Sequence, residues 1–274
     1  TIDCGVSAPY YWISKHKAIP FFCTVPGGMT GIEKFSWINF GGGQELWDKL
    51  YSQFNLKGIL CGNTGVQMGG WFKKEIKSLE DFKGLKMRIP GIGAEIINRL
   101  GGTAVNMPPG EIMPALQQGV IDATEWVGPW VDKISGLHKI AKYYYGPGIH
   151  EPGTANELVM SMDKWQDLPN NLKEIVKSSC HAIYIESLAE FLHFNSLSLE
   201  ELKNQHNVKV LNFNSEIMKA MFKISRSVIT EFSQLGEIHK EIYESWQNSL
   251  IKYNKYQKFS DYGYINERIN SLKV

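Results

Sequence analysis

The chain has 274 residues, with 29 basic and 28 acidic side chains and a net charge of +1 at neutral pH. This length is enough for one large or two smaller domains, since a domain typically has about 100–200 residues. The sequence has no cationic block for a nucleic-acid partner, because phosphate binding needs clustered positive charge. It also lacks a run of about 18 apolar residues, so no segment is expected to span a membrane.

Two features concern the compartment and the extent of the chain. The four cysteines are widely spaced and include no CxxC pair, so they do not make a disulfide framework. Cys4, Cys23, Cys61 and Cys180 are expected to be small buried side chains. The opening stretch TIDCGVSAPYYW has no Met and no signal-peptide pattern, and it is typical of the inside of a domain with a strand over residues 2–6. We therefore expect the natural N-terminus to lie further upstream.

Residues 1–165 predict short strands that alternate with short helices. The run KGILCGN ends a strand, GLKMRIPG alternates and breaks at a Pro-Gly pair, and GIGAEIINRLG is a helix. TAVNMPP is a further strand, GEIMPALQQG a helix and VIDATEW a strand. This order predicts an α/β fold with parallel strands. Ligands of such sheets bind beyond the carboxyl ends of the strands, which is where Asn63, Arg88 and Glu125 fall.

Residues 166–260 contain almost no Gly or Pro and predict long helices. A first helix is expected over residues 169–204, a strand over 207–213 and a second helix over 214–252, where apolar residues recur at three- and four-residue spacing. The tail over residues 255–274 is aromatic and polar and shows no clear period.

The stretch PGIGAE has a Gly-x-Gly between a strand and a helix, but Ile96 stands where a dinucleotide site requires a third glycine. The glycines are therefore expected to form a tight turn. Arg88, at the end of the preceding strand, needs an anionic partner because an unpaired buried charge is costly. Two alternatives stay open here: an internal salt bridge, or a two-point clamp for a ligand carboxylate.

Acidic and amide side chains follow several of the predicted strands. Glu125 lies beside Trp126, Glu151 lies in the rigid turn GIHEPG, and Gln67 precedes two glycines. Their oxygen atoms suit a Na⁺, Ca²⁺ or Mg²⁺ ion. The alternative for each acid is a surface or salt-bridged role, and Asp122 could cap a neighbouring helix.

Other constellations give weaker signals. His138 and His150 lack the spacing of a zinc site and are interpreted as ordinary polar residues. The sequence has no GxSxG and no Cys–His signal, so no nucleophile is predicted. A carboxylate pair for glycoside hydrolysis stays open, although neither Glu125 nor Glu151 is marked as the acid. The aromatic stretches PYYW and EWVGPW are expected mainly to pack loops on the sheet and in part to wall a small-molecule pocket.

Six ordered stretches carry a resemblance to a known family: SAPYYW, VPGGMTGIEKFSWINFGGGQELWDKLY, GNTGVQMGGWF, FKGLKMRIPGIGAEI, PPGEIMPALQQGVIDATEWVGPW and YYYGPGIHEPG. Together they resemble the periplasmic substrate-binding proteins of tripartite ATP-independent periplasmic (TRAP) transporters. The branch that they resemble binds 2-oxo acids or lactate with a metal cation. Family members begin with an export signal and further elements before the stretch that opens this chain, and many have VPFG where this chain has VPGG.

The resemblance implies a two-domain periplasmic binding protein fold of the α/β class, in which both domains close on a ligand and long helices cross them. It places residues 1–43 and 125–165 in domain I, residues 44–124 in domain II and residues 166–274 in the domain-spanning helical part.

The resemblance also implies roles for single residues. Arg88 clamps the ligand carboxylate, and the other predicted ligand contacts are Asn63, Tyr10, Tyr11 and Trp126. The cation, Na⁺ or Ca²⁺, is held by Gln67, Glu125, Glu151 and the main-chain carbonyl of Trp126. The implied partners are a small carboxylate and the membrane permease subunits. The long helices carry more apolar surface than one layer on a sheet requires, so a homodimer that pairs through residues 215–260 is a further expectation. The alternative is that these apolar residues span both domains or cover the part of the protein that precedes this stretch.

We therefore predict a periplasmic solute receptor, and not an enzyme, for a small monocarboxylate such as pyruvate or lactate. The alternative is a metal-dependent hydrolase or lyase that uses Glu125 or Glu151 as its base. The sequence favours the receptor, because no positioned nucleophile or acid–base pair accompanies the predicted metal ligands.

Overall fold

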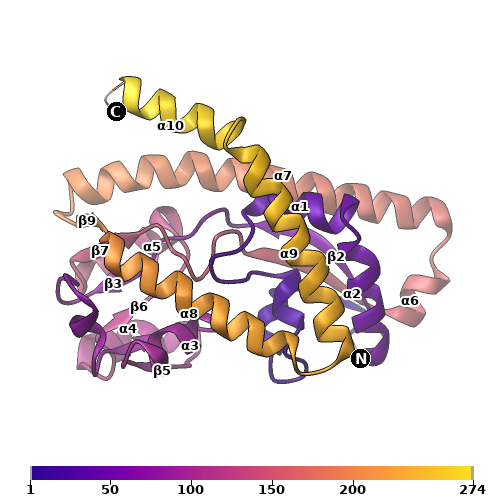
Figure 1. Ribbon diagram of the computed structural model, residues 1–274, viewed down its shortest axis with the longest axis horizontal. Coiled ribbons are helices and arrows are strands. Elements are labelled where there is room, and N and C mark those ends of the chain that lie inside the picture. The colour runs from indigo at the N-terminus through magenta and orange to yellow at the C-terminus, as the bar shows by residue number, and fades with distance from the viewer. Residues whose placement is uncertain (1, 273–274) are drawn as a thin grey trace.

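The computed structural model of the chain describes residues 2–272 and contains two β-sheets (Figure 1). The first sheet is antiparallel, with the order β1 (Cys4–Ser7), β8 (Ala155–Ser161), β2 (Leu56–Asn63). The second has six strands, in the order β5 (Thr103–Val105), β4 (Lys86–Arg88), β6 (Ala123–Thr124), β3 (Gly70–Phe72), β7 (Tyr143–Gly146), β9 (Lys209–Asn212). In this sheet β4 pairs in parallel with β5 and β6, and β7 with β9, whereas β3 is antiparallel to both of its neighbours.

Helices cover both sheets and connect them. They are α1 (Gly31–Phe40), α2 (Gly43–Tyr51), α3 (Gly93–Arg99), α4 (Pro109–Gln118), α5 (Pro129–Ile134), α6 (Met162–Asp167), α7 (Asn170–Asn204), α8 (Ser215–Ser233), α9 (Glu237–Gln257) and α10 (Asp261–Leu272). Short 3-10 turns lie at η1 (Pro9–Trp12), η2 (Ile19–Phe22), η3 (Ser52–Phe54), η4 (Leu79–Phe82) and η5 (Leu137–Lys139). Within residues 2–272, none of the helices combines the length and the apolar character needed to cross a membrane.

Each sheet has its own apolar core. Beside the first sheet, Phe22 stacks between Trp37 and Trp47, with ring centroids 5.7 and 5.1 Å apart. In the second sheet, Trp71 and Tyr144 stack at 3.9 Å. Large flat side chains fill much apolar volume with few rotatable bonds, so each half of the molecule is a packed unit.

Helix α7 joins the two halves, and Figure 1 shows it running along the length of the molecule. Tyr184, in its first half, packs in the core beside α1 and α2, and its hydroxyl donates to the carbonyl of Gly31 at 2.8 Å. Leu202, two residues before its C-terminal end, packs in the other core with Trp71 and Tyr144. The predicted α/β fold with long domain-spanning helices is therefore confirmed.

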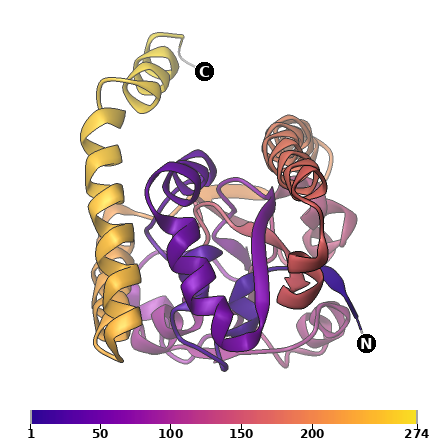
Figure 2. The same ribbon diagram turned by 90° about the vertical axis from the view of Figure 1, so that its right-hand side faces the viewer.

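The second long helix differs from the prediction. Residues 214–252 form α8 and most of α9, which are separated by a break at residues 234–236. Gly236 has φ +156°, a conformation that residues with a side chain rarely adopt, so it allows the chain to turn there. Within the tail, which showed no clear period, residues 261–272 form α10, which projects beyond the body of the molecule (Figure 2).

The sheets divide the chain at other places than the predicted domain boundaries. The chain passes from the first sheet to the second over residues 64–69 and returns over residues 147–154. Strand β2 thus belongs with β1 and β8, while β7 belongs to the second sheet. Local patterns mark strands but do not show which distant strand is the partner, so boundaries after residues 43 and 124 missed both crossings.

The cysteines differ in burial, and all four are free. Cys23 and Cys180 are buried as expected and Cys61 is half-buried, but Cys4 is exposed on β1.

Candidate functional site

A cavity of about 350 Å³ lies between the two sheets and is lined by residues from both. The first sheet and η1 contribute Val6, Tyr10 and Tyr11, and the second contributes Arg88 and Trp126. Thr64, Gln67 and Thr154 line it from the two crossing segments. A site that is built from both halves and both crossings responds to any change in their relative position.

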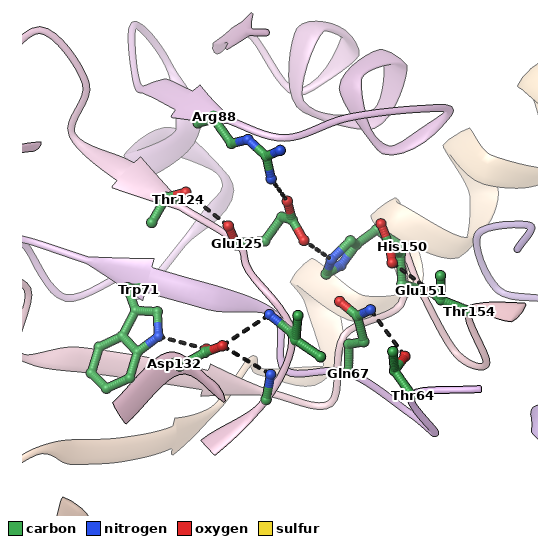
Figure 3. Close-up of polar contacts among 12 residues, drawn as sticks. Thr64, Gln67, Trp71, Arg88, Thr124, Glu125, Asp132, His150, Glu151 and Thr154 are labelled. Atoms are coloured by element: carbon green, nitrogen blue, oxygen red, sulfur yellow. Dashed lines mark hydrogen bonds and ion pairs between the residues drawn. The ribbon is translucent and has the colours of Figure 1, made fainter. Parts of the chain in front are cut away.

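Arg88, which lines this cavity, forms a buried ion pair with Glu125 (Figure 3). Arg88 is the last residue of β4, and Glu125 follows β6 directly, so the parallel pairing of these strands brings the two side chains together. The guanidinium Nη1 donates to Oε1 of Glu125, and both side chains are almost fully buried. The arginine thus has the internal salt bridge of the first alternative, while its Nε has no hydrogen-bond partner among residues 2–272.

Glu151 approaches the same place from the second crossing. Its Oε2 accepts a hydrogen bond of 2.5 Å from the hydroxyl of Thr154, and the side chain is buried. Gln67 lies opposite on the first crossing, where its Nε2 donates to the hydroxyl of Thr64 at 3.1 Å. The carbonyl oxygen of the Gln67 side chain is buried and has no donor within the described part of the chain.

His150 completes the cluster, with Nε2 3.3 Å from Oε2 of Glu125. Ligand atoms of Glu125, His150 and Glu151 lie within 4.8 Å of one another, and all three residues are buried. Two carboxylates with a third donor at this spacing can hold a metal ion. The interpretation of His150 as an ordinary polar residue was therefore incomplete.

The electrostatics of the cluster follow from burial. Burial raises the pKa of Glu125 to about 7, against the lowering effect of Arg88. Burial and then the nearby charge of Glu125 raise the pKa of Glu151 to about 7. Burial lowers the pKa of His150, so its ring is neutral at neutral pH. Two buried carboxylates beside a single guanidinium repel each other, and a cation between them would relieve that repulsion.

Two close backbone contacts fix the loops that carry these residues. The N–H of Gly148 donates to the carbonyl of Gln67 at 2.8 Å, and the N–H of Gln67 donates to the carbonyl of Glu151 at 3.0 Å. A Cβ on Gly148 would lie 2.7 Å from the carbonyl oxygens of Gln67 and Met68, so only glycine allows this approach. Gly148, in the stretch YYYGPGIHEPG, thus brings Gln67 beside Glu151.

Asp132, at α5, supports the segment behind Glu125 and Trp126 (Figure 3). Its Oδ1 accepts from the N–H groups of Val127 and Gly128, both at 2.9 Å. Its Oδ2 accepts from Trp71 Nε1 and from the Tyr144 hydroxyl, both at 2.8 Å. All its bonds reach a strand or the segment after Glu125, so Asp132 fixes the path of that segment.

The aromatic residues that were predicted to contact a ligand lie at the cavity. The guanidinium carbon of Arg88 is 5.4 Å from the ring centre of Trp126. Tyr10 and Tyr11 lie edge to face at 4.6 Å, with Tyr10 buried and Tyr11 exposed. Burial, together with the charge of Glu151, raises the pKa of Tyr10, so its hydroxyl stays protonated and can donate a hydrogen bond.

Asn63 does not fit its predicted role, because the protein takes up its side-chain groups. Its Nδ2 donates to the Tyr184 hydroxyl at 2.7 Å, and its Oδ1 accepts from the N–H of Gly65 at 2.8 Å. Asn63 is not among the residues that line the cavity. Asp122 does not cap a helix: its Oδ2 accepts from the N–H of Lys86 at 3.0 Å, at the start of β4.

Three residues that shape the site were not predicted from the sequence. Thr154 orients Glu151, Thr64 orients the amide of Gln67, and Asp132 holds the segment after Trp126. The only local signal was position, since Thr64 and Thr154 lie on the same loops as Gln67 and Glu151.

A cavity between two α/β halves that are joined by a long shared helix defines a two-domain ligand-binding protein. Residues 1–235 match the family of bacterial extracellular solute-binding proteins, family 7 (DctP). The chain belongs to this family, so it is a solute receptor and not an enzyme, and the hydrolase or lyase alternative is wrong.

Several proteins are similar to the chain over most of its length. The monocarboxylate 2-oxoacid-binding periplasmic protein of Nostoc sp. is 38% identical over 263 residues, which are 95% of this chain and 72% of the relative. A TRAP solute-binding protein of Colwellia psychrerythraea, solved with calcium and pyruvate, is 39% identical with a TM-score of 0.92, over 97% of this chain and 81% of that one. One of Pseudoalteromonas atlantica, solved with sodium and pyruvate, is 37% identical with a TM-score of 0.91, over 96% and 80%.

A further solved structure is a TRAP solute-binding protein of Bordetella bronchiseptica. It is 33% identical with a TM-score of 0.95, and the match covers 99% of this chain and 81% of that one. It is a mixed-occupancy dimer, with calcium and picolinate in one site and the other site empty.

Proposed function

We propose that this protein is a TRAP-transporter receptor that binds a small 2-oxo monocarboxylate together with a calcium or sodium ion. The observation that carries the proposal is the buried cluster of Glu125, Glu151 and the carbonyl oxygen of Gln67, which has no donor within residues 2–272, beside the buried guanidinium of Arg88. Relatives that are 37–39% identical were solved with pyruvate and one of these cations, which supports the assignment.

The proposed cation ligands are the side chains of Gln67, Glu125 and Glu151 and the main-chain carbonyl of Trp126. Each carboxylate oxygen has a second lone pair, so Glu125 can bind a cation while it accepts from Arg88. Arg88 would meet the ligand carboxylate with the N–H groups that Glu125 does not occupy, among them Nε, which has no partner in the described part of the chain. Tyr10, Tyr11 and the ring of Trp126 would wall the cavity. Asn63 is no longer proposed as a ligand contact.

Charge balance favours joint binding of cation and anion. One guanidinium and two ionised carboxylates leave the buried cluster with one negative charge. A calcium ion with a monocarboxylate brings the site to neutrality, whereas sodium with the same anion leaves one negative charge. A buried site is most stable when its charges compensate, so we expect calcium to support tighter anion binding than sodium.

Calorimetry with pyruvate, lactate and propionate tests the proposal. Propionate keeps the carboxylate and the chain length but lacks the 2-oxygen that would complete the cation's coordination. We expect pyruvate to bind at least about tenfold more tightly than propionate, because a site built for an oxygen ligand is left incomplete without it. Equal affinities for pyruvate and propionate would contradict the proposal. Mass spectrometry of the ligand that co-purifies gives an independent identification.

The compartment and the permease follow from the proposed role. A receptor of this family acts outside the cytoplasmic membrane and delivers its solute to membrane permease subunits, so we propose the periplasm as the location.

We also propose a homodimer, but through α10 and not through the predicted residues 215–260. Helix α10 buries none of its residues, and four of its five large exposed apolar side chains form one stripe at helical spacing, Tyr262, Ile265, Ile269 and Leu272. A helix of this length is marginal in water unless its apolar face is covered. The Bordetella bronchiseptica dimer, whose match covers 99% of this chain, supports a second copy as the cover. Light scattering should give a dimer for the whole chain and a monomer after truncation at Ser260; a monomeric whole chain would contradict the proposal.

A further inference from the structure

The indole of Trp126 lies between two cavities. On one side is the ligand cavity, with Arg88 and Gln67. On the other is a separate, mostly apolar cavity of about 270 Å³, lined by Ile112, Met113 and Leu137. Of the residues that the structure describes, Trp126 alone lines both of them. Apart from Trp126, the residues that line the second cavity are not among those proposed to bind the cation or the carboxylate.

Contacts on the ring and on the backbone keep the indole in this position. Arg88 places its guanidinium carbon 5.4 Å from the ring centre, a distance at which a cation is attracted to an indole face. The other surroundings are the apolar residues of the second core, including Ile112 and Leu137. Asp132 accepts hydrogen bonds from the N–H groups of Val127 and Gly128, which restrain the backbone directly after Trp126.

We propose that the indole of Trp126 is a partition that limits the length of the ligand's apolar tail. The inference rests on the proposed function, because it concerns the tail of a carboxylate bound at Arg88. A group that pairs with Arg88 lies beside the indole, since the guanidinium lies over the ring. A short tail ends against this wall. A longer tail would need the space that Ile112, Met113 and Leu137 surround, and the ring closes the way to it.

The test compares pyruvate with 2-oxohexanoate, which has three more methylene groups, in calorimetric titrations of the whole protein with calcium present. Trp126→Leu removes the partition and joins the two cavities. Each methylene that becomes buried improves affinity roughly fourfold. We expect the ratio of the 2-oxohexanoate to the pyruvate affinity to rise by at least about tenfold in this variant. Trp126→Phe, a milder change, should move the ratio in the same direction by less.

Met113→Ala is the matched control, because it enlarges the apolar cavity and leaves the partition in place. We expect its affinity ratio to equal that of the wild type. The double variant Trp126→Leu with Met113→Phe should lower the ratio again by refilling the joined space. An unchanged ratio in both Trp126 variants overturns the partition, as does a raised ratio in Met113→Ala. If the wild type binds no 2-oxo acid at all, the proposed function fails, and the partition fails with it.

Discussion

Asp132 and Glu151 are buried acids that lie 19 positions apart in the chain, and they differ in the number of hydrogen bonds that the protein donates to their carboxylates. Asp132 accepts four hydrogen bonds, from Trp71, Tyr144, Val127 and Gly128. Among residues 2–272, Glu151 accepts one, from Thr154, and it lies near the carbonyl oxygen of Gln67, which has no donor in this range (Figure 3). Burial raises the pKa of both acids, to about 6 for Asp132 and about 7 for Glu151.

The difference separates a structural acid from an acid that is kept for a ligand. A buried carboxylate with four donors is a stable part of the fold, whereas one with a single donor near another carboxylate costs stability until a cation arrives. Burial alone does not distinguish the two cases. The number of protein donors distinguishes them. Substitutions of Asp132 and Glu151 should therefore have opposite effects on stability and on binding.

Asp132→Asn should have the largest effect, and the effect should be on stability. The amide has one acceptor oxygen for four donors, so buried N–H and O–H groups lose their partner, at a cost of about 3–4 kcal/mol. Urea unfolding measures the change. Glu190→Gln, at an exposed position of α7, is the control and should leave the midpoint within experimental error. A loss below about 1 kcal/mol for Asp132→Asn would show that the four bonds do not stabilise the fold.

Glu151→Gln should act in the opposite sense. Removal of one of two buried charges keeps an oxygen ligand but weakens cation binding by roughly 30-fold, about 2 kcal/mol. Without the cation, the variant should be at least as stable as the wild type, because a repelling buried charge is gone. Calcium titration and urea unfolding in chelator give both values. Undiminished calcium affinity would remove Glu151 from the proposed ligand set.

Arg88→Lys should weaken anion binding by about 1–2 kcal/mol, because an ammonium cannot make the planar two-point contact. The charge that pairs with Glu125 is kept, so the fold should be retained. Calorimetry with pyruvate in saturating calcium gives the affinity. If Arg88→Lys binds pyruvate as tightly as the wild type, the role of Arg88 is limited to its ion pair with Glu125.

Lys34 extends the comparison to a buried basic side chain that does not line the ligand cavity. Its Nζ donates to the carbonyl of Phe21 at 2.5 Å, and burial lowers its pKa from 10.5 to about 7. Between these two values the unfolded chain binds one more proton than the folded chain, so wild-type stability falls as pH falls from about 10 to about 7. The unfolding free energy of Lys34→Met minus that of the wild type should rise by about 1.4 kcal/mol for each pH unit lowered in this range. A difference that does not change with pH would mean that Lys34 keeps its charge in the fold.

Motifs predicted the fold class and much of the site region, because strand ends and glycine turns are local features. VIDATEW placed Glu125 at the end of β6, and KMRIPG placed Arg88 at the end of β4. The ion pair between them depends on the register of two strands 37 positions apart, which no local pattern encodes. For the same reason the sequence did not show that His150 lies beside Glu125 or that Asp132 accepts four hydrogen bonds. It also did not show that the side chain of Asn63 bonds to Tyr184.

The central claim is that one site binds the cation and the carboxylate together. Calorimetric titration with pyruvate, once in saturating calcium and once in chelator with sodium replaced by a large organic cation, tests it most directly. We predict at least about a tenfold loss of pyruvate affinity in chelator, and an equal loss of calcium affinity when pyruvate is absent, because linkage is reciprocal. Equal pyruvate affinity under both conditions would contradict the account.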